Sequence, residues 1–369
     1  MTTKFFHGLA LTLLVLGCGK WQVAHAVEVT GLYQTSLPVE SREDQKQRAR
    51  AFTAGLQEVL VKLTGHADIV AVPDIQEALK NAQSYVEGWT YQTRLEPRTQ
   101  QQRLVIDISF YQAGIQRMLN NAGIGLWPQT RTETVVWLII QDEKDERVVA
   151  DSNAGTGLLE MQALNTQAAK FGLPGRYPAW DMEDQDAMPP DLLWMQDEAA
   201  LRAASSRYQY DSILAIRVIK LVTGQVVAKS LHLFRDHVQA TEVLEGTLDD
   251  FLKATASMVA RELSDNYAVR TVSGKGVTSS ESQLLLLSVD GVHGLNDYAN
   301  VLHYVQSLAG ISEVHVREAR ADTLTFSLNA AGQVRQLVEN LAIDRKLQVA
   351  GKPAADASSS HLYYRWQSQ

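Results

Sequence analysis

The residues best placed to do chemistry form an acidic segment, Asp181–Asp186, with the sequence DMEDQD. Asp181, Asp184 and Asp186 lie close enough in sequence to bind a hard cation or to act as an acid/base pair. A calcium-binding loop also needs a glycine at its sharp turn and a distal bidentate glutamate, and both are missing here. A glycosidase pair needs two carboxylates that face each other across a cleft, which spacing within one segment cannot show. We therefore predict a solvated loop, with metal binding or catalysis as the alternative.

No other motif in the sequence predicts a catalytic centre. The nine histidines are scattered, and the closest pair outside the first 26 residues, His232 and His237, lies around a predicted strand turn. The Gly-x-Ser-x-Gly, His-Glu-x-x-His and Ser-x-x-Lys motifs are absent from the sequence. A triad dispersed along the chain stays open, because geometry and not order defines it. We predict no catalytic residue, no metal and no cofactor.

Residues 1–26 have the three parts of an export signal. Lys4 precedes an apolar stretch, and Ala24-His25-Ala26 is the small-residue pattern of a signal cleavage site after Ala26. The apolar stretch is shorter than the ~20 residues of a spanning helix. A second processing route competes, because Val15-Leu16-Gly17-Cys18 resembles a lipobox, in which Cys18 would carry lipid. Cys18 is the only cysteine, so the mature domains cannot hold a disulfide.

Composition and charge narrow the classes of function. The chain has 369 residues, of which 45% are hydrophobic and 21% charged, which is typical of a folded globular protein. Its net charge is −8, and loss of a signal that contains lysines but no acids makes the mature chain more acidic. Nucleic-acid binding and polybasic membrane docking need clustered Lys and Arg, so both are disfavoured. We expect a periplasmic protein without a transmembrane span, held at the outer membrane only if Cys18 is lipidated.

Hydrophobic periodicity predicts two domains before residue 269. In the first, 27–128, a long helix follows the N-cap candidate Ser41, and two alternating strands form a hairpin before a further helix. This order predicts a small α+β domain. In the second, 129–268, apolar strands without alternation at 134–140 and 212–219 are interleaved with helices, which predicts a three-layer α/β domain.

A third domain is predicted at 282–350, behind a small-residue linker at 269–281. Its elements follow the order βαββαβ of a ferredoxin-like sandwich. We expect residues 351–369 to form a flexible tail with an aromatic terminus. Large aromatic residues after such a tether are expected to dock, either on the protein's own sheet or domain crevice or on a partner. These candidate interaction residues are Tyr363, Tyr364 and Trp366.

Trp127, which precedes Pro128, lies at the predicted boundary between the first two domains. A large aromatic residue in such a place is either an interdomain plug or a recognition residue. The position favours the plug, and we keep Trp127 as a candidate interaction residue.

Six segments in the first two domains have a characteristic order and spacing. They are Leu32-Tyr33 ahead of Pro38-Val39, the predicted helix Arg48–Phe52 running into Val59–Gly65, Gly125–Pro128, Val136-Trp137-Leu138, Tyr177–Asp181 and Arg207–Asp211. Together, over about 30–265, they resemble the exported domain-of-unknown-function family 2066 of Gram-negative bacteria. The resemblance implies export but no particular activity, so no catalytic residue follows from it. In element order alone, the middle domain is similar to the amino-terminal domain of the Tol-system propeller protein and to flagellar assembly periplasmic proteins, which are binding modules.

The sequence thus predicts a non-enzymatic protein of the cell envelope that binds another envelope component. One alternative is a hydrolase that acts on wall or surface polysaccharide through Asp181–Asp186. The other alternative is a small-ligand receptor.

Overall fold

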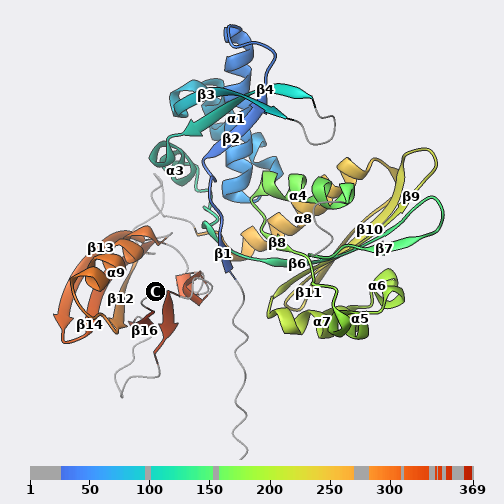
Figure 1. The fold of residues 1–369 in the computed structure, drawn as a ribbon. Coiled ribbons are helices and arrows are strands. Elements are labelled where there is room, and N and C mark those ends of the chain that lie inside the picture. Colours follow the sequence, from blue (N-terminus) through green and yellow to red (C-terminus); the bar gives the residue numbers. More distant parts are fainter. Residues whose placement is uncertain are drawn as a thin grey trace, which may run out of the picture.

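The computed structural model describes residues 26–95, 101–152, 158–269, 282–308, 311–331, 337–338, 340–342, 346–350 and 361–367. Along this part of the chain, three domains follow one another, each with its own sheet and core (Figure 1). Helices and strands alternate in all three, which confirms the predicted fold class of tandem small α+β and α/β domains.

The first domain packs helix α1 against a three-stranded antiparallel sheet of order β2-β4-β3. Its elements are β1 (Ala26–Glu28), β2 (Gln34–Pro38), α1 (Gln45–Thr64), α2 (Pro73–Lys80), β3 (Val86–Leu95), β4 (Gln102–Phe110) and α3 (Gln112–Asn121). Strands β3 and β4 form the expected hairpin. Ile106 and Ile108 of β4 meet Phe52 and Leu56 of α1 in the core. The alternation seen in the sequence therefore marks the half of the hairpin that faces α1.

Helix α1 begins and ends at residues that cap it. Asp44, and not the predicted Ser41, is the N-cap, because its carboxylate accepts hydrogen bonds from the amides of the first turn. At the other end Gly65 has a φ of 72°, in the left-handed region. A Cβ at Gly65 would collide with Ser264 of the second domain. Glycine here both ends the helix and allows the two domains to approach closely.

The second domain is built on a sheet of order β11-β10-β9-β6-β7, with the short β8 also paired to β6. Its strands are β5 (Thr130–Thr132), β6 (Thr134–Gln141), β7 (Arg147–Val149), β8 (Gly175–Arg176), β9 (Ser212–Lys220), β10 (Val226–Phe234) and β11 (His237–Gly246). Its helices are α4 (Leu159–Phe171), α5 (Met182–Ala187), α6 (Pro190–Met195), α7 (Glu198–Ser205) and α8 (Leu248–Tyr267). The central strands β6 and β9 run parallel, whereas β5 pairs with β1 from the first domain.

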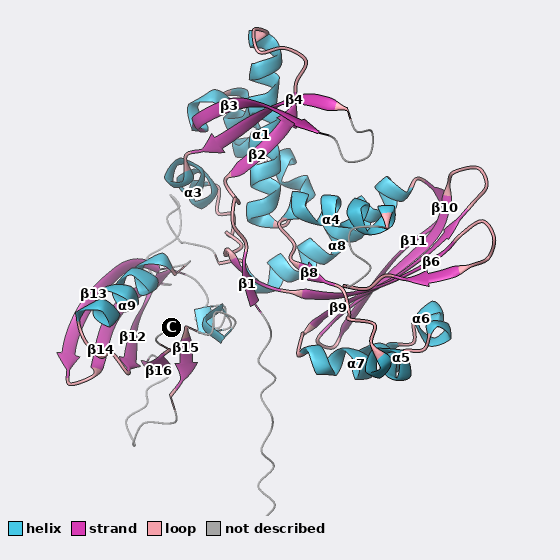
Figure 2. Ribbon diagram, viewed as in Figure 1, coloured by secondary structure: helices cyan, strands magenta, loops and turns pink. Residues whose placement is uncertain are grey.

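Both faces of this sheet are covered, which explains why its central strands do not alternate. Val136 and Leu138 of β6 belong to one core with α4 and α8. Val135 and Trp137 belong to a second core with α6 and α7. Successive strand residues point to opposite faces, so a strand between two helical layers is apolar throughout. Figure 2 shows these two layers on either side of the sheet.

The third domain has a five-stranded sheet of order β13-β14-β12-β16-β15. Its elements are β12 (Ser282–Asp290), α9 (Leu295–Ser307), β13 (Ile311–Arg320), β14 (Thr323–Ala331), β15 (Leu347–Val349) and β16 (His361–Trp366). β12 pairs antiparallel with β14, and β14 pairs antiparallel with β13. This is the arrangement expected for the first part of a ferredoxin-like βαββαβ domain.

Strand β16 changes the predicted end of the third domain. It lies between β12 and β15, parallel to β12 and antiparallel to β15. The expected last strand, β15, is therefore displaced by one position from β12. Residues 361–366 are an interior strand and not a flexible terminus, which corrects the boundary predicted at 350. Residues 351–360 of the predicted tail, and 270–281 of the predicted linker, lie outside the described residues.

Candidate functional site: the domain junctions and the cavity between them

The acidic segment forms a helical corner instead of the predicted loop. Asp181 is the N-cap of α5, and its carboxylate accepts the amide of Asp184. Arg207, which follows α7, donates to both carboxylate oxygens of Asp181, at 2.7 and 3.0 Å. The same guanidinium donates to the fully buried Asp184 at 2.9 Å. Hydrogen bonding from Arg207 lowers the pKa of Asp181 to about 2, so this group is ionised at neutral pH.

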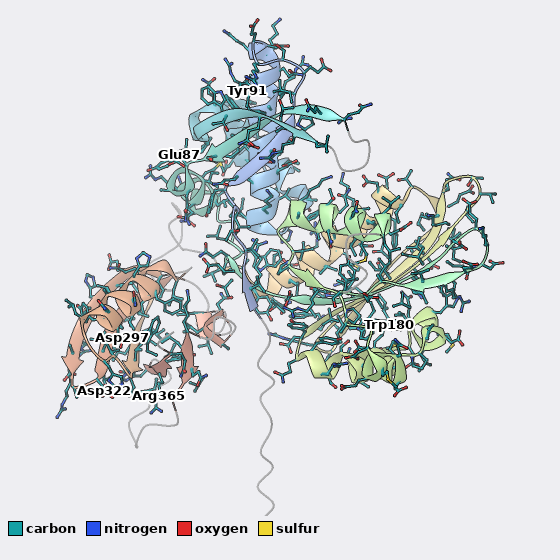
Figure 3. The ribbon with its side chains drawn as sticks, viewed as in Figure 1. Glu87, Tyr91, Trp180, Asp297, Asp322 and Arg365 are labelled. Carbon is teal, nitrogen blue, oxygen red and sulfur yellow. The ribbon has the colours of Figure 1, made fainter. Side chains whose placement is uncertain are left out.

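The remaining oxygen of Asp184 is also bonded within the protein. It accepts the Trp180 amide at 2.8 Å and the Tyr208 hydroxyl at 2.5 Å. Trp180, which is labelled in Figure 3, packs edge-on against Trp137, with 6.3 Å between the ring centroids. These contacts thus attach the helical layer that contains α5, α6 and α7 to the sheet. Asp186 is exposed, and within the described ranges no three His, Cys, Asp or Glu side chains lie close enough to hold a metal ion.

A Ser-His-Glu arrangement, which the sequence had left open, lies at the centre of the second domain. Ser212 Oγ is 2.9 Å from His232 Nε2, and His232 Nδ1 is 2.8 Å from Glu262 Oε2. The three side chains come from β9, β10 and α8. Their connectivity is that of a hydrolytic triad, with serine, imidazole and carboxylate in that order.

The surroundings of this arrangement favour a structural role. Ser212 and His232 are fully buried, and Glu262 is 5% exposed. Ser212 Oγ also lies 2.8 Å from Thr134 Oγ1, so the chain of hydrogen bonds continues into β6. A nucleophile must reach a substrate atom next to stabilising donors, and Ser212 lines neither of the cavities described below. The four side chains instead join three adjacent strands and α8 through a chain of buried hydrogen bonds.

Trp127 lies at the junction between the first two domains. Its ring is 1% exposed and belongs to the core of the second domain. Its amide donates to the carbonyl of Leu63, in the last turn of α1, at 2.8 Å. The guanidinium of Arg131 stacks on the indole, 3.8 Å from the ring centroid. Trp127 is therefore enclosed by groups from both domains.

Arg131 is fully buried and binds the ends of two helices. Its Nη2 donates to the carbonyl of Lys62 in α1 at 2.6 Å, and its Nη1 donates to those of Phe171 and Gly172 at the end of α4 at 2.9 and 2.8 Å. Its Nε donates to the carbonyl of Pro128 at 3.0 Å. The last carbonyls of a helix lack partners within the helix and carry its negative dipole end. Burial lowers the pKa of Arg131 to about 9, which leaves it charged at neutral pH.

Further contacts connect the same two domains. Arg261 of α8 donates to the carboxylate of Asp68 at 2.8 Å. Leu126 and Val269 exchange backbone hydrogen bonds of 2.9 Å each. Together with the β1–β5 pair, these contacts make the first two domains one bonded unit.

A cavity of about 620 Å³ lies where this unit meets the third domain. Trp127 and its neighbours form one wall, which Tyr33 and Gln116 of the first domain extend. The third domain contributes Tyr304 and Lys346 to the opposite wall. Further amide side chains line it, namely Gln112, Asn120, Gln129, Gln306 and Asn340, whereas no Asp or Glu is among the described lining residues. Amides offer both donors and acceptors, so the cavity suits a ligand rich in hydroxyl or amide groups.

The aromatic residues near the end of the chain support one wall of this cavity. Tyr364 is 2% exposed in the core of the third domain. The Tyr363 hydroxyl lies 2.8 Å from His361 Nδ1 in the same strand. The Trp366 ring lies 5.8 Å from the ring of Tyr304, which lines the cavity. These side chains therefore dock on the protein's own sheet, which is one of the two docking places predicted for them.

Of the predicted export signal, residues 1–26, the structure describes only Ala26. Cys18 lies outside the described residues, and Ala26 is the first residue of β1, where it pairs with Thr132. No helix in the described ranges is both long and apolar enough to cross a lipid bilayer. Processing at Ala26 or at Cys18 stays a prediction.

Two features of this region were not predicted from the sequence. Arg131 belongs to no sequence motif. Because arginine is seldom fully buried, its residue type predicts an exposed side chain. Its only sequence signal is its position four residues after Trp127. The Ser212–His232–Glu262 set is dispersed over three elements, and pairing of β9 with β10 was needed to bring the first two together.

The comparison with known protein families gives a match to the first domain. Residues 26–128 match a family described as Domain of unknown function (DUF8605). No curated protein sequence matches the chain. The resemblance to family 2066 stays a prediction.

Some solved structures show a weak likeness. A competence or damage-inducible protein from Enterobacter asburiae is 12% identical with a TM-score of 0.22, over 42% of this chain and 92% of that chain. A CinA superfamily protein from Enterobacter cloacae is 13% identical with a TM-score of 0.22, over 41% and 88%. Competence damage-inducible protein A from Klebsiella pneumoniae is 16% identical with a TM-score of 0.21, over 42% and 92%. At such scores these likenesses support no inference about fold or function.

Proposed function

We propose that the protein is a non-enzymatic envelope protein of the Gram-negative periplasm, and that it binds another envelope component in the cavity between its domains. The cavity is the observation that carries this function. Its volume of about 620 Å³ falls within the ~300–1,000 Å³ of typical ligand sites, which are often found at domain boundaries. The predicted export signal and the acidic composition support the location.

The use of the reactive side chains favours binding over catalysis. Asp181 and Asp184 accept hydrogen bonds from Arg207, and Ser212 is enclosed beside His232. A general acid or base must reach the substrate proton, and a nucleophile must reach the substrate carbon. The side chains of Asp181, Asp184 and Ser212 instead form hydrogen bonds with other groups of the protein. The amides of the cavity, by contrast, lie on a surface that a ligand can contact.

The geometry supports the two alternative functions, a polysaccharide hydrolase and a small-ligand receptor, to different degrees. A polysaccharide hydrolase that uses the acidic segment would depend on carboxylates that hold the fold together, and only Asp186 is outside that network. Substitution of Asp181 and Asp184 would therefore disturb folding, so Asp186→Asn is the cleaner test of such an enzyme. A small-ligand receptor gains support from the same cavity that carries the main proposal.

Site-specific photocrosslinking in living cells tests the proposed site. A photoreactive residue at Gln112 or Gln306, on opposite walls of the cavity, should capture the same component reproducibly. A photoreactive residue at Gln92, exposed on β3, is the matched control and should not capture it. A Gln116→Trp substitution that fills the cavity should abolish capture from Gln306 without lowering the melting temperature. Equal capture from all three positions, or capture that survives the filled cavity, would place binding elsewhere.

A further inference from the structure

The second domain contains a separate pocket of about 330 Å³, between α4, α8 and the central strands. Its floor is formed by aliphatic side chains that are each nearly fully buried: Val136, Leu164, Leu214, Ala256 and Val259. Its mouth lies where Asn165 and Ala169 of α4 approach Gly175 of β8, and these three residues are exposed. Figure 1 shows α4 and α8 together on this side of the sheet. The pocket is therefore a half-open recess at one edge of the helical layer.

The lining excludes polar ligands. No charged side chain is among the described residues of the pocket wall. Thr134 is bonded to Ser212 at 2.8 Å, and the Tyr177 hydroxyl donates to Asn165 at 3.2 Å. A sugar, an amino acid or a phosphate would leave its own polar groups unpaired against aliphatic walls, which is unfavourable. Only an apolar body fits the floor, with hydrogen-bonding groups available near the mouth.

Small residues create this space within an otherwise well-filled core. Ala168 and Ala169 of α4 and Ala256 of α8 line the pocket, whereas aromatic side chains such as Phe251 and Phe171 fill the same core on either side. The recess has the volume of roughly eleven water molecules, at about 30 Å³ each, and its mostly apolar lining offers such waters few hydrogen-bond partners.

We propose that this pocket binds one straight alkyl chain, of roughly eight to ten carbons by volume, with its polar head at the mouth beside Tyr177. The ligand class is a medium-chain fatty acid or the equivalent part of an acyl lipid. The half-open recess admits the chain from the solvent side, and the absence of charge in the described lining leaves the head group in solvent. This site shares no lining residue with the interdomain cavity, so it stands whether or not that cavity binds a partner.

Titration of the purified chain with decanoate, followed by calorimetry, tests the pocket. We expect saturable binding of one decanoate per chain and no binding of glucose. Ala256→Leu fills the floor and should weaken decanoate binding at least tenfold. Ala169→Trp covers the mouth from an exposed position and should have the same effect without disturbing the core.

The matched control is Ala199→Trp, an exposed alanine of α7 on the opposite face of the sheet, and it should bind decanoate like the unchanged chain. Should Ala256→Leu fail to fold, Ala169→Trp decides alone. Absence of saturable binding by the unchanged chain would overturn the proposal. Equal binding by Ala169→Trp and the control would overturn it as well, because the ligand would then sit elsewhere. A vesicle of diacyl lipid, added in place of decanoate, distinguishes a membrane-bound acyl chain from a free fatty acid by whether the protein co-sediments with it.

Discussion

The two domain junctions of this protein are built in opposite ways. Between the first and second domains, Arg131 donates to the ends of two helices while Trp127 is enclosed beside it. Between that unit and the third domain, a hydrogen bond from Asn340 to the Tyr267 carbonyl lies next to a cavity of about 620 Å³. One junction is filled by a cation and an indole, and the other encloses open space.

From this difference we infer that the first junction serves stability and that the second serves ligand recognition. A buried cation that satisfies helix ends contributes only if its geometry is kept, so the first junction must be rigid. A cavity between domains can change its width at little cost in packing, which is useful for admitting a ligand. We therefore expect the first two domains to respond to substitution as one unit and the third domain to respond separately.

The largest effect should come from truncation after Ser360, which removes β16. Loss of an interior strand takes the buried Tyr364 and the half-buried Trp366 with it, on the order of 5 kcal/mol or more, which is enough to unfold a small domain. Calorimetry should show that the transition of the third domain is lost while that of the first two domains is kept.

Arg365→Ala is the control for this truncation. Arg365 is an exposed residue of β16 (Figure 3), so its loss should leave both transitions in place. An isolated fragment of residues 282–367 should fold, whereas 282–350 should not. If the truncated chain keeps both transitions, β16 is not needed for the stability of the third domain.

The next effect should come from Arg131→Met. This change keeps much of the side-chain volume but leaves the carbonyls of Lys62, Phe171 and Gly172 without their donor. We expect a loss of about 3 kcal/mol in the free energy of unfolding, measured by urea denaturation. Arg50→Met, at an exposed position on α1, should change it by less than about 0.5 kcal/mol. Equal effects of the two variants would show that the first junction does not depend on its buried cation.

The smallest effect concerns Asp181, which is remote from both junctions. Its pKa in the folded protein is about 2, against about 3.9 in an unfolded chain. The depressed pKa stabilises the fold fully above pH 4, and the stabilisation is lost as the pH falls from 4 to 2. Arg207→Gln should flatten the pH dependence of the urea midpoint in this window. Arg202→Gln, which breaks the exposed pair with Glu198, should not, and an unchanged slope in Arg207→Gln would refute the assignment.

Local patterns in the sequence predicted most elements because local physics determines them. The run Val135–Ile140 is apolar on both faces, and the structure buries it between two helical layers. The alternation at Leu104–Phe110 predicted one half-buried strand of a hairpin, and β4 is that strand. The N-cap of α1 was placed at Ser41 instead of Asp44 because both residue types cap helices and only the backbone course distinguishes them.

Long-range pairing was beyond the same reasoning. Tyr363, Tyr364 and Trp366 were recognised as residues that must dock, but their alternation fits any sheet that has a free position. The burial of Asp184 was also missed, since its partner Arg207 lies 23 residues away. The interdomain cavity depends on side chains from all three domains, and no local pattern brings these together.

The parallel pair of β12 and β16 has a consequence for how the third domain is made. Ser288 and His361, which are hydrogen-bonded across that pair at 2.9 Å, are 73 residues apart. Contacts of such separation form late, because the intervening chain must be ordered first. Until β16 arrives, one edge of β12 presents unpaired amides and carbonyls, a template for association with another chain. A nascent third domain is thus exposed to aggregation for longer than the first two, and it is the part of the molecule that would gain most from a chaperone.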